Sequence, residues 1–193
     1  MRNFVGILFF LFFSVSALSQ TLTAIEVNNR WGFKDERGNI VIPPVYLFAY
    51  DFNKSGTTAV FTDSGWVYIN QKGKPLFSVL AIDNGPDYFS GGLARFVDDK
   101  KIGYFNETGQ IVIYPMFDFA FPFENGTALV CNDCIQVQNG EHYFTLGGNW
   151  MRIDSTGSVI QKLSQEESSN INAAPVTLNG ELIWIDQSGK RIK

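Results

Sequence analysis

One short pattern recurs five times along the chain, and it constrains the fold more than any other feature. Asp or Asn is followed three residues later by Gly. The pairs are Asp35/Gly38, Asn70/Gly73, Asn106/Gly109, Asp154/Gly157 and Asp186/Gly189. These residue types are typical of a type I turn, because the short side chain bonds the backbone two residues on and Gly adopts a positive φ without a clash. The pattern therefore predicts five β-hairpins.

The residues around each turn have the composition of strands. A bulky apolar residue lies seven positions before each turn glycine: Trp31, Trp66, Ile102, Trp150 and Leu182. Aromatic and β-branched residues flank the turns, as in Ile40-Val41-Ile42, and such runs favour a buried pleated surface. Apolar residues occupy both strand faces, for example Tyr68 and Ile69. We therefore expect both faces to be covered, by neighbouring repeats or by the far side of a closed sheet.

The spacing of the turns predicts the architecture. Successive turn glycines lie 35, 36, 48 and 32 residues apart, and periods of 20 to 50 residues are typical of solenoids, propellers and arrays. We predict one all-β domain over residues 20–193, made of tandem antiparallel β-hairpin repeats in a stacked, solenoid-like array. The copies lie near residues 30–63, 64–99, 100–146, 147–177 and 178–193. The alternative is a closed propeller-like or barrel-like ring, which the uneven last intervals disfavour.

Copies one and three match further without a gap, from Pro44 and Pro115 to Phe52 and Phe123. The segment Arg30-Trp31-Gly32-Phe33, with Asp35, Gly38 and a later Phe-x-x-Gly-x-Ala at 89–94 and 123–128, resembles the WG-repeat family. Copy three has Ile102-Gly103, whereas copies two, four and five lack this Gly. The resemblance implies a β-rich tandem-repeat interaction scaffold of bacterial proteins without an assigned chemistry, so it brings no catalytic residues.

The first 19 residues have the pattern of a secretory signal peptide. Arg2 is followed by an apolar stretch over Phe4 to Phe13 and by the small-x-small site Ala17-Leu18-Ser19. The alternative is a membrane anchor, but the apolar run is shorter than the ~20 residues that span a bilayer. We therefore expect cleavage after Ser19, no membrane span afterwards, and an exported protein in the periplasm, the medium or the outer surface.

Charge excludes one large class of partner. Loss of Arg2 with the leader would change the formal charge from −4 to −5, and the chain has no basic run. Nucleic-acid binding relies on clustered Lys and Arg, so we expect no nucleic-acid partner. The 18 Phe, 7 Tyr and 4 Trp supply enough large apolar side chains for a core.

Three segments depart from the repeat. Residues 21–29 read as a leading strand, Leu22 to Val27, that turns at Asn28-Asn29. Residues 131–148 read as an added hairpin with its turn at Asn139-Gly140, because Asn-Gly between alternating runs favours a two-residue loop. Residues 163–174 are polar and read as a loop or a short helix, and residues 178–193 read as a truncated terminal copy.

Cys131 and Cys134 form a Cys-x-x-Cys motif. The pair could be a redox site or half of a zinc site, but the sequence predicts no strand-to-helix setting and offers only His142 as a further imidazole ligand. A disulfide that closes a small turn is favoured in an exported protein, ahead of two free thiols. We predict no metal and no cofactor.

No catalytic residue is assigned. His142 is the only histidine and has no nucleophile at a suggestive spacing, and the turn carboxylates are explained by their turns. Trp66, Trp150 and Trp184 are candidates for ligand contact as stacking platforms, although the repeated spacing of Trp66 and Trp150 favours a packing role, while Trp184 is offset by two residues. The sequence thus predicts an exported, non-catalytic scaffold that contacts a protein or an envelope polymer. A Trp-based glycan-binding module and a carboxylate-dependent hydrolase are the alternatives.

Overall fold

The computed structural model describes residues 21–82, 85–139, 142–171, 174–178 and 181–185. The signal-peptide prediction at Met1–Ser19 and the fifth turn at Asp186–Gly189 lie outside these residues. The described chain is almost entirely antiparallel β-structure, and the sheets in this part of the chain do not close into a barrel. The predicted all-β repeat fold is confirmed.

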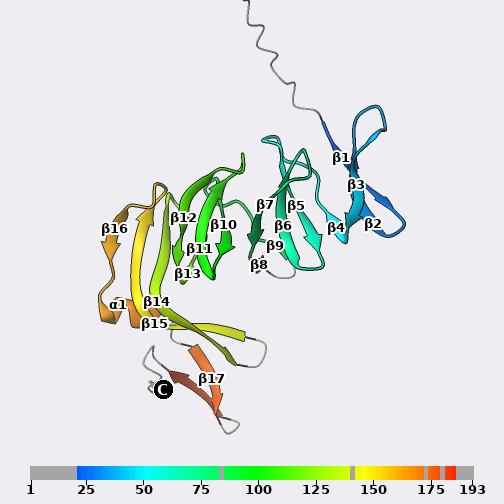
Figure 1. Cartoon of the computed structure of the whole chain (residues 1–193). Coiled ribbons are helices and arrows are strands. Elements are labelled where there is room, and N and C mark those ends of the chain that lie inside the picture. Colours follow the sequence, from blue (N-terminus) through cyan, green and yellow to red (C-terminus); the bar gives the residue numbers. More distant parts are fainter. Residues whose placement is uncertain (1–20, 83–84, 140–141, 172–173, 179–180, 186–193) are drawn as a thin grey trace, which may run out of the picture.

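The repeating element is a three-stranded antiparallel meander. The meanders are β1 (Thr23–Val27), β2 (Arg30–Lys34) and β3 (Ile40–Tyr46); β5 (Thr57–Thr62), β6 (Gly65–Asn70) and β7 (Pro75–Val79); β10 (Leu93–Asp98), β11 (Lys101–Asn106) and β12 (Ile111–Phe117); β14 (Thr127–Asn139), β15 (His142–Asp154) and β16 (Val159–Lys162). They follow one another in a row (Figure 1). After the first meander, each takes its first strand from the end of the preceding sequence copy, so meander and copy are one strand out of phase.

Short strands connect the meanders. β4 (Phe48–Ala49) pairs with β5, and β13 (Phe119–Ala120) pairs with β14. Between the second and third meanders β7 pairs directly with β10, which gives a seven-stranded sheet from β4 to β12. Two further hairpins are β8 (Ala81–Ile82) with β9 (Gly85–Pro86), and β17 (Ala174–Leu178) with β18 (Glu181–Ile185).

The predicted turns have one geometry. The Gly38 amide donates to the Asp35 carbonyl at 3.0 Å, and Asp35 Oδ1 accepts from the amides of Arg37 and Asn39. The same bonds recur at Asn70, Asn106 and Asp154. Asn53 makes them too, with Gly56 at the fourth position. The leading hairpin is also confirmed, since Asn28 and Asn29 have φ of 52° and 60°.

The glycine of the Trp-Gly motif has a steric role that alternates along the chain. In the first meander Trp31 pairs with Tyr46 and Phe33 with Ile42, so three residues bulge opposite Gly32. A Cβ there would lie 2.5 Å from the Ile42 carbonyl oxygen. Gly103 faces an equivalent bulge in the third meander. In the second and fourth meanders the second and third strands pair without a bulge at this position, and Val67 and Met151 stand in place of the glycine.

The meanders therefore group into two double units, Thr23–Val79 and Leu93–Lys162. Each contains an aromatic triad at the same positions: Phe48, Tyr50 and Trp66 in the first, and Phe119, Phe121 and Trp150 in the second. In the first triad the ring centroid of Phe48 lies 5.1 Å from that of Tyr50 and 6.1 Å from that of Trp66. In the second triad the equivalent distances from Phe119 are 5.0 and 6.0 Å. This similarity explains why copies one and three match without a gap in sequence.

Both faces of the central strands are buried, as the sequence predicted. Tyr104 and Phe105 are adjacent in β11 and each is 0% exposed. They belong to different clusters: Tyr104 packs in the core of the second double unit, and Phe105 packs against Tyr68 in the cluster that includes Trp66 of the first. The aromatic side chains thus join one unit to the next.

The added hairpin is not separate from the repeat. β14 and β15 pair from Thr127–Asp154 out to Asn139–His142, and their far ends project beyond the row of meanders (Figure 1). The register corrects the predicted turn, because an Asn139-Gly140 turn would pair Gln138 with Glu141, whereas Gln138 pairs with Tyr143. Residues 140 and 141 lie outside the described part. The polar segment forms helix α1 (Gln165–Ile171). Among the described residues, no helix is long and apolar enough to cross a bilayer.

Candidate functional site

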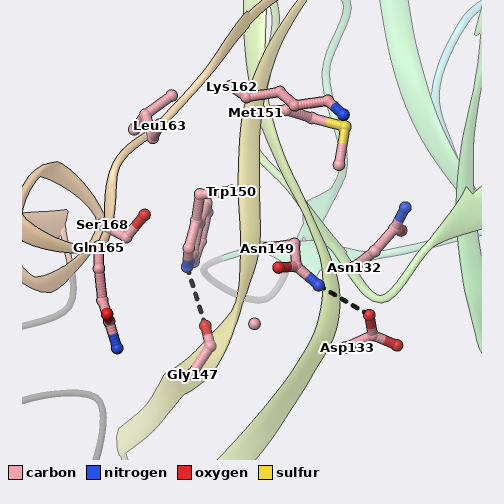
Figure 2. Close-up of a pocket in the computed structure, with 11 residues that line it drawn as sticks. Asn132, Asp133, Gly147, Asn149, Trp150, Met151, Lys162, Leu163, Gln165 and Ser168 are labelled. Atoms are coloured by element: carbon pink, nitrogen blue, oxygen red, sulfur yellow. Dashed lines mark hydrogen bonds between the residues drawn. The ribbon is translucent and has the colours of Figure 1, made fainter.

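A hollow lies where the fourth meander meets α1, with a cavity volume of about 760 Å³. Figure 2 shows Trp150 of β15 between the helix residues Gln165 and Ser168 and the strand residues Asn132 and Asn149. The lining is mixed in character. Its polar side chains are Asn132, Asp133, Asn149, Lys162, Gln165 and Ser168, and its apolar side chains are Trp150, Met151 and Leu163.

A local distortion of the hairpin forms one wall of this cavity. The described pairing skips the position where Asp133 would face Gly148, and Asp133, Gly147 and Gly148 have φ of 61°, 68° and 81°. Only Gly fits at 148, since a Cβ there would overlap the Cys131 sulfur and lie 2.7 Å from the Cys134 Cβ. The positive φ values also favour Gly.

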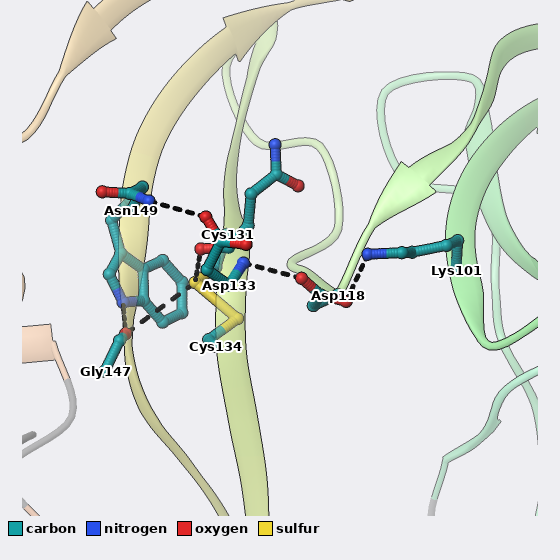
Figure 3. Close-up of a disulfide and its surroundings, with 9 residues drawn as sticks. Lys101, Asp118, Cys131, Asp133, Cys134, Gly147 and Asn149 are labelled. Carbon is teal, nitrogen blue, oxygen red and sulfur yellow. Dashed lines mark hydrogen bonds and ion pairs between the residues drawn. A yellow bond between two sulfur atoms is a disulfide. The ribbon is translucent and has the colours of Figure 1, made fainter.

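Cys131 and Cys134 are joined by a disulfide at this distortion (Figure 3). Cys131 is fully buried and clusters with Cys134 and Trp150. In the first double unit Phe61 occupies the position of Cys131 and packs on Trp66 at 5.0 Å. The sulfur atoms therefore take the place of an aromatic ring beside the tryptophan.

Polar bonds hold the loop of the motif in place. The Asp133 amide donates to Asp118 Oδ2 at 2.7 Å, and Asn149 donates to Asp133 Oδ2 at 2.9 Å. Lys101 forms an ion pair with Asp118 at 2.6 Å (Figure 3). The hydrogen bond from Lys101 lowers the pKa of Asp118 below its usual value, although desolvation opposes this. The charges here are thus engaged within the chain.

Helix α1 closes the opposite side of the cavity. The Glu167 amide donates to Ser164 Oγ at 3.2 Å, while Glu167 Oε2 accepts from the Ser164 amide at 2.7 Å. This is a reciprocal capping box, and the Ser164 amide lowers the pKa of Glu167. The Ser-x-x-Glu signal is in the sequence, and it would have favoured a helix over a loop.

The cavity does not assemble a hydrolytic pair. Asp133 is the only carboxylate among its described lining residues, and His142 lies in β15 at the far end of the long hairpin, paired with Asn139. Within the described chain, His, Cys, Asp and Glu do not gather in groups of three that could hold a metal ion.

The tryptophans named as candidate ligand contacts have different positions. Trp66 is 8% exposed and Trp150 is 2% exposed, and the Trp150 Nε1 donates to the Gly147 carbonyl at 3.0 Å. Most of each indole is therefore packed in the core, as a packing role requires, and the remaining surface of Trp150 lines the cavity. Trp184 lies in β18, paired with Pro175, and a contact role for it stays a prediction.

Exposed apolar side chains lie on the third strands of the first and third meanders, and Val159 and Ile160 on β16 are exposed as well. Those of the first and third meanders occupy positions 71 residues apart, except that Pro43 is the equivalent of Tyr114. We call this set the apolar rim: Ile40, Val41 and Val45 on β3, with Ile111, Val112, Tyr114 and Met116 on β12. Val45 is 58% exposed and its equivalent Met116 is 54% exposed.

A buried ion pair lies between the two double units, and no sequence motif predicts it. Asp87 is 1% and Arg95 6% exposed. The guanidinium donates to both Asp87 oxygens, at 2.9 and 2.6 Å, and to the Ala120 carbonyl at 2.8 Å. The pair joins β10 to β13 of the next meander.

Comparison with known families agrees with the motif. The model of the WG containing repeat matches residues 31–66 and 102–133, which confirms the resemblance to the WG-repeat family for these two segments. Both begin at the strand that carries the Gly facing a bulge. Curated proteins give no match to the chain.

Proposed function

We propose that these WG repeats form an exported, non-catalytic binding scaffold that contacts a partner protein or an envelope polymer. The observation that carries this proposal is the apolar rim. Exposed apolar side chains recur at equivalent positions of β3 and β12, and each strand presents a local apolar surface of the kind that often marks a binding site. A repeated surface suits a partner that is long enough to contact two meanders.

The rim is suited to contact through side chains. Both strands are the last of their sheets, and unpaired edge strands tend to associate through the backbone. Pro43 and Pro44 in β3, and Pro115 in β12, lack the amide hydrogen that such pairing needs. Their bulges also interrupt the regular edge. This favours a specific partner over further strand addition.

Export rests on the leader pattern at residues 1–19, and the Cys131–Cys134 disulfide is compatible with an oxidising compartment. Expression of the full chain in a bacterial host, followed by fractionation and N-terminal sequencing, tests this part. We expect a periplasmic or secreted product that starts at Gln20. An uncleaved cytoplasmic product would contradict it.

The binding role is tested by capture from envelope extracts with a rim variant and a matched control. We expect Val45→Ser combined with Met116→Ser to lose the partner that the wild type retains, with an unchanged thermal unfolding midpoint. Ile135→Ser is the control, because Ile135 is 63% exposed and lies on the projecting hairpin. Equal capture by wild type and rim variant would contradict the proposal, as would turnover in a broad hydrolase panel.

Glycan binding is a second candidate function. Because its lining is mixed, the 760 Å³ cavity is a better candidate glycan site than the buried indoles. Asn132, Asp133, Asn149 and Gln165 offer hydrogen-bond donors and acceptors, as a ligand rich in hydroxyl groups needs. Envelope polysaccharide binding that Asn149→Ala weakens, and that the rim variant does not affect, would replace the scaffold proposal with this one.

A further inference from the structure

Each double unit has a cleft at the same place in its frame. The first cleft has a volume of about 340 Å³. The part of its lining that comes from the first double unit includes Tyr50, Asp51, Asn53, Thr57, Ala59 and Tyr68. The second, about 220 Å³, is lined by Phe121, Pro122, Glu124, Thr127, Leu129 and Arg152. These residues correspond one to one in the two registers. The chain has therefore kept one hollow twice and changed its chemistry.

The first cleft is aromatic. The Tyr50 ring packs on Trp66 at 5.7 Å, and the Tyr68 ring packs on Phe89 at 5.5 Å. Tyr88 adds a third tyrosine to the lining, after strand β9, and is 57% exposed. Burial raises the pKa of Tyr68 to about 12, so its ring is neutral at physiological pH. Electron-rich rings around a small hollow attract cations.

Formal charge in the first cleft is negative. Asp51 gives one carboxylate oxygen to the Ala24 amide at 2.9 Å and lines the wall. Asp87 is neutralised by Arg95. The described lining residues include no Lys or Arg. In the second cleft Arg152 stands where the first has Tyr68, and Leu129 stands where the first has Ala59. The second hollow is smaller, and its lining includes one cation, Arg152, and one carboxylate, Glu124.

We propose that the first cleft binds an ammonium group, the side chain of a lysine on the partner protein. The proposal rests on the binding role above and names the chemistry by which the partner is recognised. Tyr50 and Tyr88, which are 47% and 57% exposed, supply the accessible π surface, and Asp51 supplies the opposite charge. The second cleft is lined by both Glu124 and Arg152, so its formal charges balance and it lacks the net attraction for an ammonium group.

The test uses the full mature chain and a small probe, N-acetyl-lysine N-methylamide, with the norleucine analogue as the neutral isostere. Binding is followed by NMR shifts of the tyrosine rings. We expect the lysine probe to bind with a Kd on the order of 1 mM and the norleucine analogue to shift the rings little at the same concentration. Tetramethylammonium is a third probe of the same charge.

Variants locate the site. Tyr88→Ala and Asp51→Asn should each weaken the lysine probe about threefold to thirtyfold. Tyr88 is exposed, and Asn keeps an acceptor for the Ala24 amide, so both should fold. Phe121→Ala, in the second cleft, should leave the affinity unchanged.

Equal binding of the norleucine analogue, or binding of tetramethylammonium without the lysine probe, would overturn the proposal. So would an affinity that Tyr88→Ala leaves unchanged. Failure of the scaffold role is distinguishable, because the probe would still bind while envelope extracts yield no protein partner.

Discussion

The two double units share a frame and differ in what the frame carries. Their aromatic triads have nearly the same spacing, and Gly32 and Gly103 each face a bulge that leaves no room for a side chain. Their clefts and hairpin tips have diverged. The first unit ends its hairpin in a tight turn between Thr62 and Gly65, whereas the second extends it to Asn139 and His142.

The difference teaches that turns and bulges fix the frame, while side chains that point into hollows are free to vary. Three equivalent positions illustrate this. Ala59 leaves the first cleft open and Leu129 partly fills the second, whereas Arg95 occupies the matching site at the middle junction and binds Asp87. The same place in the frame is thus a cavity, a smaller cavity and an ion pair.

The largest loss of stability is expected from breaking the ion pair between the two double units. Asp87→Ala should lower the free energy of unfolding by about 3–5 kcal/mol, because it leaves the buried Arg95 cation without its partner. Urea unfolding measures this. The double variant Asp87→Leu with Arg95→Met is the control and should cost much less, since it removes both charges. A loss in Asp87→Ala as small as in the double variant would show that the pair is dispensable.

A smaller loss should follow from filling the space opposite a bulge. Gly103→Ala places a Cβ 2.6 Å from the Ile113 carbonyl oxygen and 2.8 Å from the Pro115 nitrogen, and backbone cannot yield as a flexible side chain does. We expect a loss of about 1–3 kcal/mol in urea unfolding. Val67→Ala, at the unbulged equivalent, should cost roughly 1 kcal/mol or less. Equal losses would contradict the steric role of the glycine.

The sequence predicted the frame well, because its determinants are local. Gly38 and its equivalents follow Asp or Asn at a fixed distance, and the turn they predict depends on nothing further along the chain. The Trp-Gly motif was recognised, but not its reason, since the bulge opposite Gly32 involves residues beyond the turn.

The clefts and the ion pair could not be read in this way. Asp87 and Arg95 are close in sequence, but their burial depends on Ala120 of the next meander. The first cleft likewise requires β9 to lie beside β6. The sequence predicts the added hairpin, but the signal at Asn139-Gly140 places the partner of Gln138 two residues before the observed one, Tyr143.

In the second double unit, sulfur takes the place that the ring of Phe61 has in the first, and removing the disulfide should have a moderate effect. Cys131→Ser with Cys134→Ser should lower the free energy of unfolding by up to about 2 kcal/mol, since the closed loop is short. Reductant should reduce the stability of the wild type similarly and leave the variant unchanged. Without reductant, the mass of the wild-type chain should be two hydrogens below the mass calculated for a chain with two free thiols. A full-mass protein would reject the disulfide.

The smallest effect concerns acid, and it separates turns that are otherwise alike. The Asn39 side-chain amide lowers the pKa of Asp35, and the Thr156 hydroxyl lowers the pKa of Asp154. A carboxyl whose folded pKa lies below its unfolded value, near 3.8, stabilises the fold above that pH. Its contribution is lost as pH falls through the folded pKa. The equivalent Asn70 and Asn106 turns cannot titrate.

Acid titration followed by amide NMR should therefore shift Gly38 and Gly157 below about pH 4, while Gly73 and Gly109 respond only when the whole chain unfolds. Asp154→Asn is the matched control, because it converts the fourth turn to the chemistry of the second and third. It should remove the shift at Gly157 and keep that at Gly38. If all four glycines respond together in the wild type, acid acts on the fold as a whole and the turns are equivalent in charge as well as in shape.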